Sequence, residues 1–377
     1  MTVLDDAFWG ASATSIDALE RELARLRRAA VAHAKERGRT LARASVLNLV
    51  VYSEREVHAR RAARTVADLA LRHPSRAIIL LGDRGREGVV ASVRLHCHVP
   101  QADGAQPVLY EQIFARVRGD FDERVASVVI PLLVPDLPVF LWWTGTPPSD
   151  ARHLDDLVGL AHRLIIDSAD FARPDRTLPE VAQLSRLHVG ITDLNWARLT
   201  HWRELVAQFF DVPVWRPFLD GITGIRVGFA VDMDGRDIHP SQALLLLGWL
   251  ASRLGWQPVE SLAPAEAGGH LFRMQRADGA AIMVRLRPRF ERGLDAGDVS
   301  GVRIQAATAR STAEFVIKRA PDERHATATA IVDGSVRAER VVPLPALTIR
   351  ELLGEELAIA GNDRVYEEAL GALMGLA

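Results

Sequence analysis

SVLNLVVYSEREVHARRAARTVADLALRHPSRAIILLGD, residues 45–83, decides the fold of the first half of the chain. Its two ends, 45–52 and 76–83, are short apolar runs of the length and composition that buried strands have. Residues 53–72 between them have the pattern of a helix, and Pro74 ends that helix before the second strand begins. We therefore interpret the stretch as a strand–helix–strand unit, the building block of a mainly parallel sheet.

The segments around this unit continue the alternation of helices and strands. Residues 89–99 and 111–119 alternate between apolar and polar side chains, so we expect them to pair as antiparallel strands at one side of the sheet. Strands are also expected over 138–143 and 163–168. Helices are expected from 16 to a stop at Gly38 and over 122–133, 153–161, 178–187 and 193–210. Together these elements predict an α/β domain with a mainly parallel, Rossmann-like sheet.

A linker then separates this domain from a second one. VPVWRPFLDG, residues 212–221, carries two prolines and a glycine, which is typical of a domain boundary. We expect an α/β domain at 1–215 and an α+β domain with an antiparallel sheet at 216–377. In the second domain, 240–256 predicts one long helix, and Asp333-Gly334 predicts a two-residue hairpin turn between the last two strands.

Composition excludes several classes of protein. The chain has 377 residues, 25% of them charged, with a formal net charge of -2, which argues against general affinity for nucleic acid. The beginning of the chain lacks the pattern of a signal peptide. The most apolar window, 128–143, holds three prolines and Asp136, so it does not predict a membrane span. Cys97 is the single cysteine, which excludes an intramolecular disulfide and fits a cytoplasmic protein.

Motifs of catalysis and cofactor binding are absent from the sequence. There is no GxGxxG after a strand, no GxxxxGK[ST], no HExxH and no GxSxG. Asp167 ends a strand at its carboxyl end but has no evident partner. His96 and His98 share one strand face, yet Arg94 beside them would repel a metal ion, so a solvated face is the favoured interpretation. We therefore expect no catalytic residues, no metal and no cofactor.

One turn has the residues of an anion site. His73, Ser75 and Arg76 lie close together before the strand at 76–83, and such side chains can hold a phosphate or a carboxylate. The alternative is a plain helix stop in which Arg76 pairs with a carboxylate of the chain. Ligands of parallel sheets gather beyond the carboxyl ends of strands, whereas this turn lies at an amino end, which favours the alternative.

A basic stripe runs along one strand of the second domain. It is formed by Arg285, Arg287 and Arg289, which alternate along 281–290. The stripe is suited to gripping an acidic partner or phosphate groups. The other interpretation, which we favour, is a solvated strand face with acidic neighbours.

The stretch DLNWARLTHWRELVAQFF, residues 193–210, is rich in tryptophan and arginine. Its apolar helical face includes Trp202, which we expect in the core. Trp196 and Arg203 lie on a different side, and Asp193 or Asn195 can cap the helix. The Trp–Arg pair is either an exposed interface hot spot or a stacked pair that locks the two domains together. The partner-binding candidates are Asp193, Trp196, Arg198, Arg203 and Trp143.

Several segments together resemble a known family. These are SVLNLVVY, HPSRAI, SVVIPLLVPDLPVFLWWTGTPP, DLNWARLTHWRELVAQFFD and LLLLGWLASRLGW, which span about residues 45 to 255. The chain is similar in them to OpcA, the glucose-6-phosphate dehydrogenase assembly protein of cyanobacteria and actinobacteria. The resemblance implies a protein that is not an enzyme. Family members bind that dehydrogenase, promote its active oligomer and raise its activity, which supplies NADPH to the oxidative pentose phosphate pathway.

The resemblance has one departure and leaves two alternatives. Cyanobacterial relatives link activation to redox control through cysteines, whereas Cys97 stands alone here and cannot form an intramolecular dithiol switch. One alternative is a sugar-phosphate-binding enzyme or sensor, lactonase-like, that uses the turn at 73–76 or the basic stripe. The other is a tether that joins pathway enzymes without changing any rate.

Overall fold

The computed structural model describes residues 7–13, 15–36, 42–43, 45–83, 88–98, 108–118, 121–147, 152–184, 189–235, 239–265, 268–322, 324–359 and 361–376. The chain forms two compact units that alternate along the sequence. The first unit comprises Met1–Asp167, Leu187–Thr192 and Ile349–Asn362, and the second comprises Ser168–Arg186, Asp193–Thr348 and Asp363–Ala377.

The first unit is built on a mixed sheet, called sheet A, with the strand order β1-β5-β6-β4-β3-β7-β8-β9 and with β2 beside β6. The pairs that run from β6 through β4, β3 and β7 to β8 are parallel, whereas β5 is antiparallel to both β1 and β6. The strands are β1 (Ala7–Ala13), β2 (Ala42–Arg43), β3 (Leu47–Ser53), β4 (Ser75–Asp83), β5 (Gly88–His98), β6 (Val108–Arg118), β7 (Val139–Trp143), β8 (Arg163–Ile166) and β9 (Gly190–Asp193). The predicted Rossmann-like sheet with an antiparallel pair at one side is confirmed.

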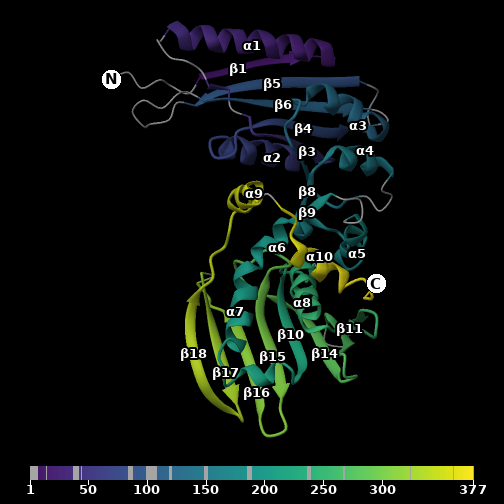
Figure 1. Cartoon of the computed structure of the whole chain (residues 1–377), viewed down its shortest axis with the longest axis vertical. Helices are drawn as coiled ribbons and strands as arrows, with labels where there is room; N and C mark the ends of the chain where they lie inside the picture. Colours follow the sequence, from purple (N-terminus) through teal and green to yellow (C-terminus); the bar gives the residue numbers. More distant parts are fainter. Residues whose placement is uncertain are drawn as a thin grey trace. The chain divides into compact units, whose positions relative to one another are not determined.

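The central strands of sheet A form the core of this unit. Val51 of β3 and Ile78 of β4 are fully buried, as expected for parallel strands that are covered on both faces. The helices of the unit are α1 (Ile16–Glu36), α2 (Glu56–Leu69), α3 (Phe121–Val129) with the 3-10 turn η1 (Ile130–Leu132), α4 (Arg152–Leu160) and α9 (Ile349–Ala358). Helix α1 lies along β1 and β5, at the antiparallel side of the sheet (Figure 1).

Helix α9 joins this unit from near the end of the chain. Arg163, at the start of β8, donates a hydrogen bond to the carbonyl oxygen of Glu356 at 3.0 Å and another to that of Gly361. Gly354 lies against α2, where an added Cβ would come within 3.1 Å of Leu69 Cδ2. These contacts hold 349–362 on the first unit, although almost two hundred residues separate it from β8.

The second unit is built on sheet B, with the strand order β11-β13-β14-β10-β15-β16-β17-β18 and with β12 beside β13. Its strands are β10 (Ile222–Val231), β11 (Gln257–Pro258), β12 (Ala263–Pro264), β13 (His270–Gln275), β14 (Ala281–Phe290), β15 (Val299–Ala307), β16 (Thr312–Arg319), β17 (His325–Val332) and β18 (Ser335–Pro343). The sheet is mostly antiparallel, which confirms the prediction, but β10 and β14 are parallel. The exception arises because helix α8 (Ser241–Leu254) follows β10 and returns the chain across the sheet.

The predicted hairpin turn joins β17 to β18. Asp333 has φ 50° and Gly334 has φ 75°, so both central residues are left-handed. This is the backbone that a two-residue type I′ turn requires, and asparagine, aspartate and glycine adopt it most readily. The prediction from Asp333-Gly334 is therefore confirmed.

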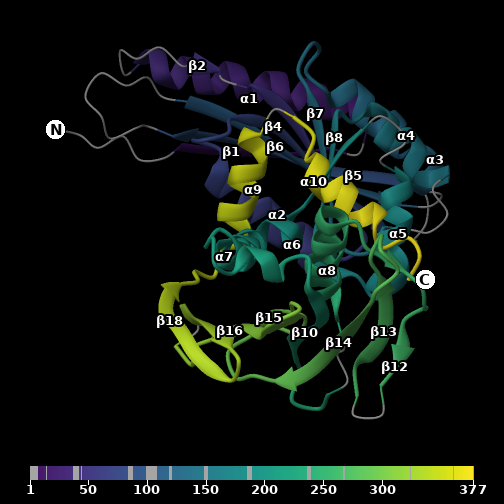
Figure 2. The same cartoon turned by 60° about the horizontal axis from the view of Figure 1, so that its bottom comes forward.

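Helix α8 is the centre of the second unit and is buried almost throughout. It packs against β10 and against α5 (Pro174–Leu184), α6 (Leu194–Arg198) and α10 (Arg364–Gly371), while α7 (Thr200–Phe210) contacts β16. Gly248 permits the close approach of α10, because an added Cβ would lie 2.4 Å from the carbonyl oxygen of Ala369. In Figure 2, α7 and α8 lie over one face of sheet B.

These contacts explain why the compact units are not the two sequence ranges predicted. Helices α5, α6 and α7 precede residue 215, yet α5 and α6 pack on α8 and belong to the second unit. The boundary near residue 215 stays a prediction for domains that fold independently. Within the described part of the chain, no helix combines the length and apolar character that crossing a bilayer requires.

Candidate functional site

The stretch that begins at Asp193 forms a buried polar network in the second unit. Asp193 is fully buried, and its Oδ1 accepts hydrogen bonds from the backbone nitrogens of Asn195 at 2.8 Å and Ser168 at 2.9 Å. It is therefore the residue that caps α6, one of the two predicted. Its other oxygen accepts a bond from the hydroxyl of Tyr366 at 3.3 Å. Burial, with the Asp193 carboxylate second, raises the pKa of Tyr366, so this phenol stays protonated and donates.

Asn195 extends the network to helix α8. Its side-chain nitrogen donates to the hydroxyls of Ser168 and Ser241, both at 3.1 Å, and its oxygen accepts from Gln242 at 3.0 Å. Gln242 also donates to Asp298 at 2.8 Å and accepts from the backbone nitrogen of Val299. Every polar atom of the Asn195 side chain is thus bonded, which is the arrangement of a structural hub.

Trp196 and Arg203 form the stacked pair, not an exposed one. Trp196 is 3% exposed, and the guanidinium carbon of Arg203 lies 3.5 Å from the centre of its ring. The indole nitrogen donates to Asp363 at 2.7 Å, and Arg203 donates to the carbonyl oxygen of Trp196 at 2.9 Å. The expectation of an exposed indole is therefore wrong, because α10 brings Asp363 and Tyr366 against this ring. The stack lies wholly within the second unit.

Trp143 is also enclosed by its own unit. It ends β7, is 3% exposed and stacks on Tyr52 at the end of β3, with ring centroids 3.8 Å apart. Trp143 is buried here and stacked on Tyr52, and its contact with a partner stays a prediction. Trp202 is 1% exposed, so its predicted place in the core is confirmed.

The Tyr52–Trp143 stack lies at the switch point of sheet A. Strands β4 and β6 follow β3 in the chain and lie on one side of it in the sheet, whereas β7 and β8 come later and lie on its other side. The strand order therefore reverses between β3 and β7. Dinucleotides bind beyond the carboxyl ends of the strands at such a switch point. Here the two rings stack on each other at the carboxyl ends of β3 and β7.

The turn after β3 does not fit a pyrophosphate. The residues that lead into α2 are Ser53, Glu54, Arg55 and Glu56, with no glycine among them. Phosphates approach a helix start through glycine backbone and positive charge, whereas Glu56 places a carboxylate in the first turn of α2. Arg60 and then Arg116 lower the pKa of Glu56, so the carboxylate keeps its negative charge. These residues do not fit a dinucleotide cofactor.

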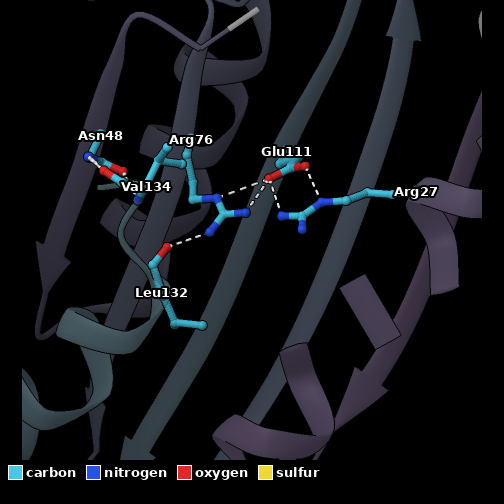
Figure 3. Close-up of polar contacts among 6 residues, drawn as sticks. All are labelled: Arg27, Asn48, Arg76, Glu111, Leu132 and Val134. Atoms are coloured by element: carbon cyan, nitrogen blue, oxygen red, sulfur yellow. Dashed lines mark hydrogen bonds and ion pairs between the residues drawn. The ribbon is translucent and has the colours of Figure 1, made fainter. Parts of the chain in front are cut away.

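The predicted anion site at 73–76 is occupied by a carboxylate of the chain itself. Arg76 is buried and binds Glu111 Oε2 through Nε at 3.0 Å and Nη2 at 2.7 Å (Figure 3). Its third nitrogen donates to the carbonyl oxygen of Leu132 at 2.7 Å. Arg27 of α1 binds the same carboxylate at 2.6 and 2.9 Å. An external anion would have to displace Glu111, so the structure supports the alternative in which Arg76 pairs internally.

The other residues of that turn, His73 and Ser75, add no second guanidinium to that of Arg76. Ser75 is 3% exposed and begins β4, and burial, with Arg72 second, lowers the pKa of His73. Asn48, on the neighbouring strand β3, accepts from the backbone nitrogen of Val134 at 2.8 Å and donates to its carbonyl oxygen at 3.0 Å. The amino ends of β3, β4 and β6 therefore carry a row of satisfied structural contacts.

The remaining sequence candidates are placed as follows. Arg198 is partly exposed and donates to Asn195 Oδ1 at 3.5 Å, and Asp167 is 4% exposed after β8. The side chains of His96, Cys97 and His98 lie outside the described residues, so the metal pair and the cysteine expectations stay predictions. Arg285 and Arg287 are partly exposed and Arg289 is exposed, on the face of sheet B that the helices leave open.

Two groups escaped the sequence analysis. Glu111 lies in the expected strand at 111–119, but no pattern in the neighbouring sequence predicts its ion pairs with two arginines. Gln242 and Asp298 are separated by 56 residues, and burial, with Asp295 second, raises the pKa of the Asp298 carboxyl. Only a polar residue within an otherwise apolar helix, as Gln242 is, could have signalled a buried contact.

Comparison with known proteins identifies the family. The domain described as glucose-6-phosphate dehydrogenase subunit N-terminal domain matches residues 66–183, and the corresponding C-terminal domain matches 189–370. The chain belongs to the OpcA family. The resemblance seen in the sequence is thereby confirmed, and the matched residues include parts of both compact units.

Three cyanobacterial proteins, each named OxPP cycle protein OpcA, are similar to the chain. The one from Nostoc punctiforme is 36% identical over 197 residues, which is 52% of this chain and 41% of that protein. The one from Synechocystis sp. is 28% identical over 316 residues, 82% of this chain and 65% of that protein. The chain thus matches less than two thirds of the length of these two OpcA proteins.

Solved structures of oxidoreductases share the arrangement of elements at a low level. KijD10, a 3-ketoreductase from Actinomadura kijaniata, has a TM-score of 0.49 and 12% identity, with 88% of this chain and 95% of that chain covered. An NAD binding oxidoreductase from Klebsiella pneumoniae has a TM-score of 0.46 and 13% identity, with the same coverage. Values this low carry no argument about the activity of an OpcA protein.

Proposed function

We propose that the chain is a non-catalytic accessory subunit that binds glucose-6-phosphate dehydrogenase in the cytoplasm, promotes its active oligomer and raises its activity. The observation that carries the proposal is the match of both OpcA domains, whose descriptions refer to a subunit of that dehydrogenase. The activation would increase NADPH production in the oxidative pentose phosphate pathway.

The residues at the switch point of sheet A support an accessory role. Tyr52 and Trp143 stack at the carboxyl ends of β3 and β7, and Glu56 places a carboxylate in the first turn of α2. A chain with these residues is suited to presenting a stable surface to another protein. It would activate the dehydrogenase by binding its active conformation more tightly than its inactive one, because a ligand shifts an equilibrium only through such differential affinity.

Among the five partner-binding candidates, Arg198 and Arg203 are the ones with exposed atoms. A hydrogen bond to Asn195 orients Arg198, and a cation–π contact with the ring of Trp196 orients Arg203. An arginine held in one orientation loses little conformational freedom on binding, which favours it as an interface residue. Asp193 and Trp196 would act indirectly, by fixing the structure beneath such a surface, and Trp143 by stabilising its own unit.

The experiment is an assay of the dehydrogenase from the same organism, with and without the full chain, at saturating substrate. An activator raises turnover or lowers the apparent Michaelis constant, and sedimentation shows a larger dehydrogenase oligomer. Binding without either change would support the tether and contradict activation. Turnover of glucose 6-phosphate or its lactone by the chain alone would contradict the accessory role.

Substitutions test whether Arg198 and Arg203 belong to the surface that binds the dehydrogenase. Arg198→Ala and Arg203→Ala are expected to weaken binding to the dehydrogenase by about tenfold each, the effect of losing an interface anchor worth about 1.4 kcal/mol. The matched control is Arg310→Ala, which removes the same charge from an exposed turn between β15 and β16. Equal affinities for all three variants would exclude this surface.

A further inference from the structure

The open face of sheet B carries a row of arginines that faces no helix. Along β10, Val227 and Phe229 are buried beneath the helices, whereas Arg226 and Gly228 alternate with them and point to the other face. This second face is the one that α7 and α8 leave uncovered in Figure 2. The side chains on this face therefore lie on the side of the sheet away from α7 and α8.

Three of these arginines lie side by side on adjacent strands. Arg226 is directly opposite Arg285 on the parallel strand β14 and directly opposite Arg303 on the antiparallel strand β15. Like charges in this relation destabilise a sheet. Arg303 has a carboxylate partner, Glu314, at 2.8 Å, but among the described residues no hydrogen bond or ion pair engages Arg226 or Arg285. The row costs stability unless an anion neutralises it.

The lowered pKa of Arg226 reflects its burial and this excess of positive charge. Burial lowers its pKa, and the charges of Arg287, Arg303 and Arg285 lower it further. The carboxylate of Glu314 acts in the opposite direction, but it comes last among the causes. The field at the centre of the row is therefore positive.

The next row of the same face is hollow. Gly228 lies opposite Arg287 on one side and Gly301 on the other, and Gly301 lies opposite Lys318 of β16. Two neighbouring positions without side chains thus form a floor between two cations. The Ser300 hydroxyl borders this floor, since a Cβ at Gly228 would lie 2.9 Å from Ser300 Oγ, and a Cβ at Gly301 would lie 3.1 Å from the Ile317 carbonyl oxygen.

The hollow has the size and lining of a site for a small anion. It is open to solvent and has a volume of about 120 Å³, which gives room for several water molecules and hence for a small anion. Its charged lining is one carboxylate, Glu291, and five cations, which are Arg226, Arg287, Arg289, Arg303 and Lys318. Guanidinium groups bind phosphate oxygens in pairs of parallel hydrogen bonds, and Lys318 adds a point charge.

We propose that the glycine-floored hollow on the open face of sheet B binds a small phosphorylated metabolite that carries at least two negative charges. The arginines grip its phosphate oxygens, and the remainder of the molecule lies over Gly228 and Gly301. The small volume of the hollow and the density of cations around it favour a small, highly charged anion. The proposal does not depend on binding to the dehydrogenase.

Calorimetric titration of the full chain with inorganic pyrophosphate, in a phosphate-free buffer of low ionic strength, tests the proposal. We expect saturable binding that Arg287→Ala and Lys318→Ala each weaken at least about tenfold, the effect of losing one charge-assisted contact. Arg287→Lys keeps the charge but loses the planar fork, so it is expected to weaken binding as well. The matched control is Arg337→Ala, on the exposed strand β18 of the same sheet, which should bind as the unchanged chain does.

Melting of the free variants separates a ligand site from a structural role. Because Arg287 stands among like charges, Arg287→Ala should leave the melting temperature of the free chain unchanged or raise it. It should abolish most of the rise that pyrophosphate gives to the unchanged chain, since a ligand that binds the folded state stabilises it. A lower melting temperature of the free variant would show that Arg287 is structural and would overturn the proposal.

Three other outcomes would also overturn it. The first is the absence of saturable heat up to about 10 mM pyrophosphate. The second is equal weakening by Arg287→Ala and Arg337→Ala, which would indicate only general attraction to positive charge. The third is a loss of dehydrogenase binding in Arg287→Ala while pyrophosphate does not bind, which would make the hollow a protein contact.

Discussion

Replacing Glu111 by glutamine tests whether the buried arginine–carboxylate cluster stabilises the first unit. The carboxylate is 1% exposed and receives four nitrogen donors, two from Arg27 and two from Arg76 (Figure 3). Oε2 accepts three of them and Oε1 accepts one, from Arg27. The glutamine amide would therefore turn its nitrogen toward Arg27 and keep its oxygen at the position of Oε2.

The cost follows from which charge is left unpaired. The side chain of Arg27 is 23% exposed and can recover a bond to water, but that of Arg76 is 5% exposed and would keep only a neutral acceptor besides Leu132. Removing one partner of a buried ion pair costs about 3–5 kcal/mol. In a unit of this size about 1 kcal/mol corresponds to roughly 2–4 °C, so we expect the melting temperature of this unit to fall by about 6–20 °C.

The control makes the same chemical change at the surface. Glu56→Gln removes a carboxylate that is 43% exposed and paired with Arg60 and Arg116, so it should cost less than about 1 kcal/mol. Both variants are compared by urea unfolding and by calorimetric melting. If Glu111→Gln loses no more stability than Glu56→Gln, the reasoning from burial is refuted.

Three further predictions concern other buried contacts. Trp196→Ala should cost about 3–5 kcal/mol in urea unfolding, because it empties a filled site and leaves Asp363 without the indole donor; weaker dehydrogenase binding at unchanged stability would contradict the burial of this ring. Trp143→Ala should lose a similar amount and Trp143→Phe distinctly less, since phenylalanine can still stack on Tyr52; equal losses would show that the stack contributes little. Because burial raises the pKa of Asp298, its stability contribution is present below the unfolded pKa and is lost as pH rises through the folded one. Asp298→Asn, which keeps an acceptor for Gln242, should therefore melt higher than the unchanged chain at about pH 7 but not at about pH 4; a difference that does not vary with pH would contradict this.

The sequence by itself determined most of the secondary structure of the described chain. Buried strands such as β3 and β4, the hairpin turn at Asp333-Gly334 and the long helix α8 all follow from periodicity and turn chemistry, which act between neighbours in the sequence. The short strand β9, of four residues, was missed. The family could also be predicted from the sequence, because a resemblance between continuous segments such as DLNWARLTHWR needs no knowledge of the fold.

Only the tertiary structure decided what the polar and aromatic residues do. Arg76 had the composition of an anion site, but Glu111, 35 residues away, neutralises it. Trp196 had the composition of an interface, but Asp363, 167 residues away, buries it. Arg226 showed no pattern at all, because its arginine neighbours lie on other strands. Burial and charge pairing depend on residues that folding brings together from far apart, and no local pattern in the sequence records them.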